Sequence, residues 1–210
     1  LGDDGLLVSE FASRELHAYS ATSGSWQEIE PPLVDGTAIP VSVAGMRGNR
    51  AVIVQAGDTS TTAQIVHVFE WAPAAGWSHI ASENGIDHTG GDSLQVKAAD
   101  IDGDLMALKV NVGTFNNQVW IYAITPTGLQ RVAVHPAPSV GPLLVAGDTV
   151  FVGDWRASGS DGAIRIHELA NGYAPQIIAS PFGGGNDQIG QRLSFSGPNE
   201  VLVDSNIGSF

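Results

Sequence analysis

The chain has 210 residues, of which 22 are acidic and nine basic, for a formal net charge of −13; 43% are hydrophobic and none is cysteine. This composition is that of a folded domain rather than a disordered acidic tail, and the few Lys and Arg argue against nucleic acid as a partner. No apolar run approaches the ~18 residues of a membrane helix, and the lack of cysteine excludes disulfide bonds, thiolate zinc sites and cysteine nucleophiles.

The predicted elements, taken in chain order, are short strands in a repeating pattern. Two apolar runs joined by a tight polar turn form a hairpin, a run with alternating bulky residues follows, and a Gly or Ser plus a bulky residue opens the last strand of each group. The predicted strands span residues 6–8, 16–19, 27–29, 41–44, 51–54, 66–69, 78–80, 96–99, 105–108, 119–122, 130–132, 143–146, 150–152, 164–167, 174–177, 193–196 and 201–203.

Nothing in the chain has the 3.6-residue periodicity of a long helix, so the predicted fold is all-β. With Leu6, Ala51, Leu105, Val150 and Val201 taken as equivalent, the repeat is about 49 residues. Four strands per repeat predict a β-propeller of four-stranded antiparallel blades. The expected blades are 1–40, 41–90, 91–140 and 141–190, with a partial blade at 191–210. Because an isolated stack of blades would leave open sheet edges, we expect a larger propeller of six or seven blades, and the alternative is a ring that these repeats close with an unusual overlap.

Segment 143–178 reads LLVAGDTVFVGDWRASGSDGAIRIHELANGYAPQII and resembles the FG-GAP propeller repeats of integrin α-subunit heads and bacterial exported proteins. Residues 187–203 are similar to the start of the next repeat, with Ile189-Gly190 where the family has Phe-Gly. The resemblance covers essentially the whole chain at low identity. It implies a propeller at the cell surface or outside the cell that binds its ligand through loops.

The run Asp100-Ile101-Asp102-Gly103-Asp104 is similar to the calcium loop of that family, with Asp at the first, third and fifth positions. Position nine is Leu108, so the last carboxylate ligand is missing. Asp100, Asp102 and Asp104 are therefore a candidate calcium site, and the alternative is a plain solvated turn, since another repeat has only Gly147-Asp148-Thr149 there. The loop from Asp154 to Asp161 is a weaker candidate for the same ion.

Aromatic residues suggest a binding surface. Trp26 and Trp77 occupy one repeat position, so we expect them in the blade cores. Trp71 and Trp155 fall outside the repeat, and with Arg156 and Asp161 they form the predicted ligand-binding set. The alternative for these residues is ordinary loop packing. His17 and His67 share a further repeat position, where period-two alternation predicts a half-exposed strand face.

No nucleophile elbow or zinc-binding spacing occurs in the sequence. The leading interpretation is therefore a non-enzymatic binding or adhesion module, extracellular or at the cell surface, that recognises a protein or glycan. One alternative is a propeller enzyme acting on extracellular polysaccharide through paired carboxylates. Another is an architectural unit of a larger surface protein, with further blades or domains as its partners.

Overall fold

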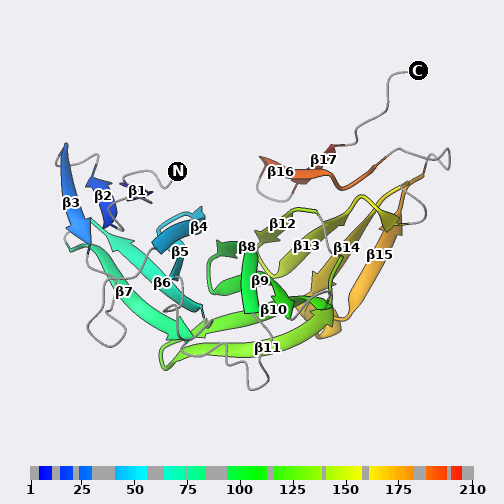
Figure 1. Cartoon of the computed structure of the whole chain (residues 1–210), viewed down its shortest axis with the longest axis horizontal. Coiled ribbons are helices and arrows are strands. Elements are labelled where there is room, and N and C mark those ends of the chain that lie inside the picture. Colours follow the sequence, from blue (N-terminus) through cyan, green and yellow to red (C-terminus); the bar gives the residue numbers. More distant parts are fainter. Residues whose placement is uncertain are drawn as a thin grey trace.

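A computed structural model describes most of the chain (Figure 1). The described residues are 5–10, 15–20, 24–29, 41–55, 64–73, 75–83, 94–112, 116–138, 141–157, 161–181, 188–197 and 200–204. His88 and most of the glycine-rich segment 181–187 lie outside them.

Every described sheet is antiparallel, and strands adjacent in sequence are adjacent in space. The first sheet contains β1 (Gly5–Glu10), β2 (Glu15–Ser20) and β3 (Ser25–Ile29). The second contains β4 (Val41–Arg47), β5 (Arg50–Gln55), β6 (Ile65–Ala72) and β7 (Gly76–Glu83). The third contains β8 (Leu94–Asp102), β9 (Leu105–Val112), β10 (Asn116–Thr125) and β11 (Gly128–Pro136). The fourth contains β12 (Leu143–Ala146), β13 (Thr149–Asp154), β14 (Ala163–Glu168) and β15 (Pro175–Ala179). The fifth contains β16 (Arg192–Gly197) and β17 (Glu200–Asp204).

The all-β prediction is confirmed, and each predicted strand coincides with an observed one; β15 begins one residue later than predicted, at Pro175. A three-residue 3-10 turn, η2 (Leu169–Asn171), precedes β15. Within the described residues, no helix has the length and apolarity that crossing a membrane requires.

The sheets stand side by side along an arc (Figure 1). Their first strands β4, β8, β12 and β16 contact one another in that order along the inner side. The last strands β7, β11 and β15 lie on the outer side. This is a propeller-like arrangement, in which each sheet packs face to face on its neighbours.

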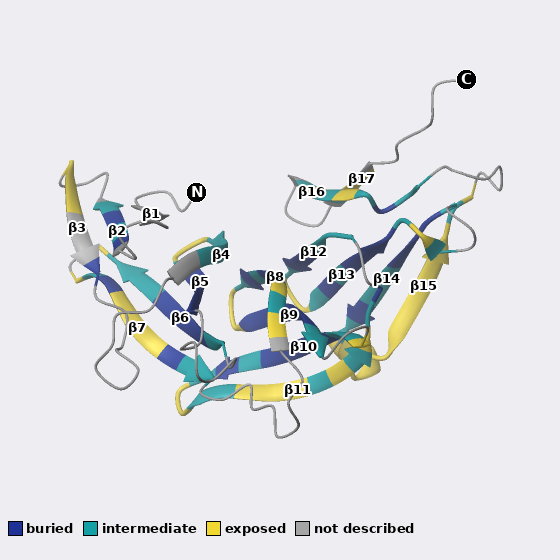
Figure 2. Ribbon diagram, viewed as in Figure 1, coloured by how far each residue is buried: buried dark blue, intermediate teal, exposed yellow. Residues whose placement is uncertain are grey.

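The core consists of apolar clusters between neighbouring sheets. Successive residues of β9 alternate between two of them: Met106 and Leu108 pack toward the second sheet, whereas Leu105 and Ala107 pack toward the fourth. A third cluster joins the first and second sheets. Figure 2 shows the result, with middle strands such as β5, β9 and β13 largely buried and an exposed outer strand β15. A strand buried on both faces reads as a continuous apolar run, which is the pattern of residues 105–108 in β9.

Glycines allow the closest backbone approaches. A Cβ on Gly153 at the end of β13 would collide with the carbonyl oxygen of Gly190, and a Cβ on Gly141 would collide with that of Gly153. Three backbone segments, before β12, in β13 and before β16, therefore meet without intervening side chains.

Candidate functional site

The antiparallel strands place the connections of each sheet at two opposite ends. One end, here called the turn end, carries the turns after the first and third strands of each sheet. Backbone hydrogen bonds join these two turns: Trp71 N donates to Asn49 O (2.7 Å), and Leu169 N donates to Asp148 O (3.1 Å). The other end, here called the loop end, carries the connection after the second strand and the connections between sheets.

The four predicted ligand-binding residues do not converge. Trp71 lies at the turn end of the second sheet, whereas Trp155, Arg156 and Asp161 lie at the loop end of the fourth. Trp71 is half-buried and its ring centre is 5.9 Å from that of Trp77. Arg156 is exposed and stacks on half-buried Trp155, with 4.6 Å between guanidinium carbon and ring centre. A single surface formed by all four is therefore ruled out by the strand directions, although each group stays a binding candidate.

The two tryptophans predicted as core differ. Trp77 is buried, but Trp26 is 57% exposed, so that expectation is wrong for Trp26. On β3, Ile29 points into the cluster shared with the second sheet, and Trp26, three residues earlier, points to the opposite face. There it contacts Tyr19, with ring centres 5.3 Å apart.

Asp100 and Asp102 link three successive sheets at the turn end. Asp100 Oδ2 accepts a hydrogen bond from Val145 N (2.7 Å), and Asp102 Oδ2 accepts one from Gly147 N (2.9 Å), both in the fourth sheet. On the other side, Arg47 of the second sheet lies 3.8 Å from Asp100 and 3.9 Å from Asp102. Burial raises the pKa of Asp100, and the amide hydrogen bonds and Arg47 oppose that shift. Both carboxylates thus have structural partners.

Arg47 also reaches across the inner side of the arc. Its guanidinium carbon lies 3.4 Å from the centre of the Phe195 ring on β16, so the second and fifth sheets meet there. The Asp100 and Asp102 carboxylates therefore lie at contacts between sheets and do not surround an open space on the inner side of the arc.

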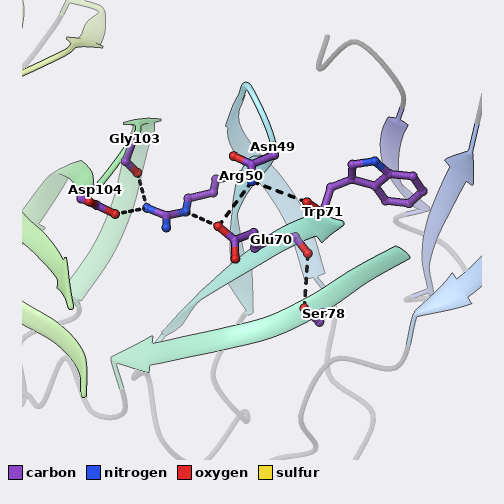
Figure 3. Close-up of polar contacts among 7 residues, drawn as sticks. All are labelled: Asn49, Arg50, Glu70, Trp71, Ser78, Gly103 and Asp104. Carbon is purple, nitrogen blue, oxygen red and sulfur yellow. Dashed lines mark hydrogen bonds and ion pairs between the residues drawn. The ribbon is translucent and has the colours of Figure 1, made fainter. Parts of the chain in front are cut away.

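Asp104 belongs to a second charged group at the turn end (Figure 3). Arg50 of the second sheet binds the Asp104 carboxylate and the Gly103 carbonyl oxygen, and its Nε donates to Glu70 Oε1 at 3.0 Å. Asn49 Nδ2 lies 3.4 Å from the same Glu70 oxygen. One guanidinium therefore holds carboxylates from two neighbouring sheets.

These contacts bear on the predicted calcium site. Among the residues that the structure describes, no group of three or more His, Asp or Glu side chains is arranged to hold a metal ion. Asp100, Asp102 and Asp104 face arginines and backbone amides instead. Calcium binding by residues 100–104 stays a prediction.

A cavity of about 390 Å³ opens beside these groups, between the third and fourth sheets at the turn end. Three carboxylates line it, and its remaining wall is largely apolar. The lining side chains are Asp102, Asp104, Leu105, Ala123, Val132, Asp148, Leu169 and Tyr173. A volume of this size and a wall of this kind are typical of small-ligand sites.

Tyr173 is placed in this cavity by the turn between β14 and β15. Gly172 and Tyr173 both have left-handed backbones, with φ of 60° and 61°, and Tyr173 N donates to Glu168 O at 2.8 Å. The residue is 5% exposed. Burial raises the pKa of the Tyr173 phenol, and Asp148 adds to the rise.

In each sheet, one residue near the loop end of the second strand and one on the third strand occupy equivalent repeat positions. These two side chains are called the strand-end pair, and their residue types differ from sheet to sheet. The turn pairings Arg47–Arg50, Asp102–Leu105 and Ala146–Thr149 set this register. The pair is Gln55 with His67 in the second sheet, Val110 with Trp120 in the third, and Asp154 with Arg165 in the fourth. Each pair faces the preceding sheet.

His67 is 2% exposed, so the expected half-exposed strand face is wrong for this residue. Its Nε2 lies 2.9 Å from Gln55 Oε1, and its Nδ1 lies 3.3 Å from His79 Nε2. Burial and the neighbouring His79 lower the pKa of His67 to about 4.

The charged pair of the fourth sheet faces Lys109 of the third. Arg165 Nη2 donates to Asp154 Oδ2 at 3.0 Å, and Lys109 Nζ donates to Gly141 O at 2.9 Å. Lys109 is 2% exposed, and burial lowers its pKa to about 8 against the opposing effect of Asp154. The sequence pattern did not indicate this charged group, because Lys109 lies within a mostly apolar strand.

Comparisons with known proteins add a fold neighbour. No family model matches the chain, and no curated protein matches it. Among solved structures, the chain is similar to a Bacteroides fragilis protein described as a "putative 6-phosphogluconolactonase", at 13% identity and a TM-score of 0.48. The match covers 97% of this chain and 61% of that one, so this chain spans about three-fifths of its neighbour's length.

The description of that neighbour names an enzyme and not an adhesion protein, so the comparisons give no support to the interpretation of this chain as a non-enzymatic binding or adhesion module. The FG-GAP relationship and the extracellular location remain predictions.

Proposed function

We propose that the chain is part of a carbohydrate-active hydrolase whose site is the 390 Å³ cavity between the third and fourth sheets. The observation that carries this proposal is the convergence of three carboxylates on one cavity with an apolar wall. Enzymes that cleave glycosidic bonds use two carboxyl groups on either side of the bond. Leu169, Val132 and the Tyr173 ring supply the apolar surface on which a sugar ring can pack.

Asp104 and Asp148 are the proposed working pair. Asp102 is committed to Arg47 and to the Gly147 amide, whereas Asp148 is exposed and lines the cavity. In the reaction, one carboxyl group donates a proton to the departing glycosidic oxygen, and the other accepts a proton from the attacking water. Arg50 fixes the orientation of Asp104.

The test is hydrolysis of a panel of neutral polysaccharides and aryl glycosides, followed by the release of reducing ends. We expect Asp148→Asn to lower the rate by a factor of about 10² to 10⁴, the usual contribution of general acid–base catalysis. Glu168→Gln is the matched control, because Glu168 pairs with Thr149 next to Asp148 but bonds Asn171 and Gln176 rather than lining the cavity. A wild-type protein that cleaves no substrate of the panel, or an Asp148→Asn variant of unchanged rate, would overturn the proposal.

We also propose that the arc belongs to a closed ring of six or seven such sheets. The ordered contacts of the first strands and the repeated apolar clusters between sheets support it. Electron microscopy of the protein from its natural source would distinguish a closed ring from an open arc.

A further inference from the structure

The contact between the third and fourth sheets, here called the seam, is apolar in its middle and charged at the loop end. In the middle it is apolar, where Leu105 and Ala107 of β9 meet Val150 and Val152 of β13. At the loop end the same strand faces continue with Lys109 on β9 and Asp154 on β13. Both side chains are buried, at 2% and 7% exposure, so this polar cluster is withdrawn from solvent.

The cluster has more donors than the described residues satisfy. An ammonium group has three N–H donors, and Lys109 Nζ uses one toward Gly141 O. Arg165 uses Nη2 toward Asp154 and Nη1 toward Pro136 O (3.4 Å), but its Nε is buried without a partner. Native interiors rarely leave such groups unsatisfied, and each one calls for an ion, a water or a ligand.

The charges of the cluster do not balance either. Lys109 and Arg165 are two cations, and among the described residues Asp154 is the one carboxylate shown to interact with both. Nearby on the same seam, His135 and His167 stack with ring centres 5.0 Å apart, and burial lowers the pKa of His167, which keeps that ring neutral near pH 7. An unpaired positive charge inside a protein is costly, and it stands out in a chain of net charge −13.

Two acceptor oxygens at this end of the seam are also buried without partners. Asn111, two residues after Lys109 on the same strand face, has a buried Oδ1 without a partner. Beyond the pair, at the end of the fourth sheet, Asp161 also has a buried unpartnered oxygen, and Arg156 is exposed on Trp155. These last two side chains have opposite formal charges.

We propose that the Lys109–Arg165 cluster is a binding site for a small oxyanion, of the sulfate, phosphate or carboxylate type. Oxyanion oxygens would accept the free hydrogen bonds of Lys109 Nζ and Arg165 Nε and would supply the missing negative charge. This site is at the opposite end of the sheets from the proposed hydrolytic cavity and does not depend on it.

The test is calorimetric titration of the protein with sulfate, against a chloride buffer of equal ionic strength. Lys109→Met removes the buried cation, and Lys97→Met is the matched control because it removes the same charge from an exposed position of the neighbouring strand β8. We expect Lys109→Met to weaken sulfate binding about 10- to 100-fold, the effect of losing one hydrogen bond to a charged group. Lys97→Met is expected to bind like the wild type.

The pH profile of the wild type is a second measurement, which needs no folded variant. Sulfate keeps its charge across this range, so a change in affinity reports the protein. Because the pKa of Lys109 is about 8, affinity should fall as the pH rises above 8. A wild type that binds no sulfate, a Lys109→Met variant that binds as tightly as wild type, or an affinity that is flat across pH 8 would overturn the proposal. Each of these outcomes would leave buried water as the partner of the cluster.

Discussion

Acid should destabilise this protein through His67 before it acts on the exposed carboxylates. The ring is 2% exposed and is held between Gln55 and His79 at 2.9 and 3.3 Å. A second proton on the imidazole would place a buried charge next to another histidine, and the Gln55 amide offers one oxygen to stabilise it. The folded protein therefore resists protonation of His67.

The size of the effect follows from the two pKa values. In the unfolded chain His67 has its ordinary pKa of 6.5, and in the folded protein burial and His79 lower it to about 4. Between these values the unfolded chain binds a proton that the folded protein does not, so the free energy of unfolding decreases as the pH falls. One pKa unit corresponds to about 1.4 kcal/mol, which gives a loss of about 3 kcal/mol by pH 4.

The assay is urea unfolding of the wild type and of His67→Gln at a series of pH values from neutral to pH 4. A glutamine retains a hydrogen bond to Gln55 but does not titrate. We expect the variant to be less stable than wild type at neutral pH and to lose less stability on acidification, by about 3 kcal/mol. Parallel pH profiles for the two proteins would refute the reasoning, because the shared carboxylates would then account for the whole acid response.

Three further predictions concern packing and metal binding. Arg47→Met should lower the free energy of unfolding by about 1–3 kcal/mol, since it leaves two partly buried carboxylates without their cation. Arg156→Met, at an exposed position, is the control and should change the free energy of unfolding by less than about 0.5 kcal/mol. Denaturant unfolding measures both. Gly153→Ala should prevent the close approach of the Gly190 carbonyl oxygen and lower the thermal midpoint by several degrees or more, as seen in a melting curve followed by circular dichroism. Adding calcium after chelation should leave the melting curve unchanged if the carboxylates of residues 100–104 keep their arginine and amide partners, and a saturable rise would show that calcium displaces those partners.

Strand positions were predictable because two local signals agree. Alternating or continuous apolar runs mark the strands, and Gly, Asp and Asn mark the turns between them. The turn Gly147-Asp148 is an example, and it lies between the predicted and observed strands β12 and β13. The alignment of the repeats to within one residue was harder to predict. The sequence pattern aligned Leu105 with Ala51 and Val150, whereas the turn pairings of the structure align it with Arg50 and Thr149. Since β9 is buried on both faces, its first four residues, 105–108, are all apolar and do not mark the register.

The roles of the charged side chains depended on contacts between sheets, which no local pattern encodes. Asp100 and Asp102 follow the spacing of a calcium loop, yet their partners are Arg47, more than fifty positions earlier, and backbone amides of the next repeat. Likewise Lys109 is one polar residue in an apolar strand, and its proximity to Asp154 is set by how two sheets pack. A useful signal was present in the shared repeat position of His67, Trp120 and Arg165, where side-chain polarity differs from one repeat to the next.

The strand-end pairs differ in chemistry from one sheet to the next. A neutral polar pair faces the first sheet, an apolar pair faces the second, and an ion pair faces the lysine of the third. If recombination replaced the fourth sheet by a copy of the third, Lys109 would be buried against valine and tryptophan with no carboxylate nearby. The order of the repeats is thus encoded at their contacts, and the sheets are not interchangeable despite their shared strand pattern.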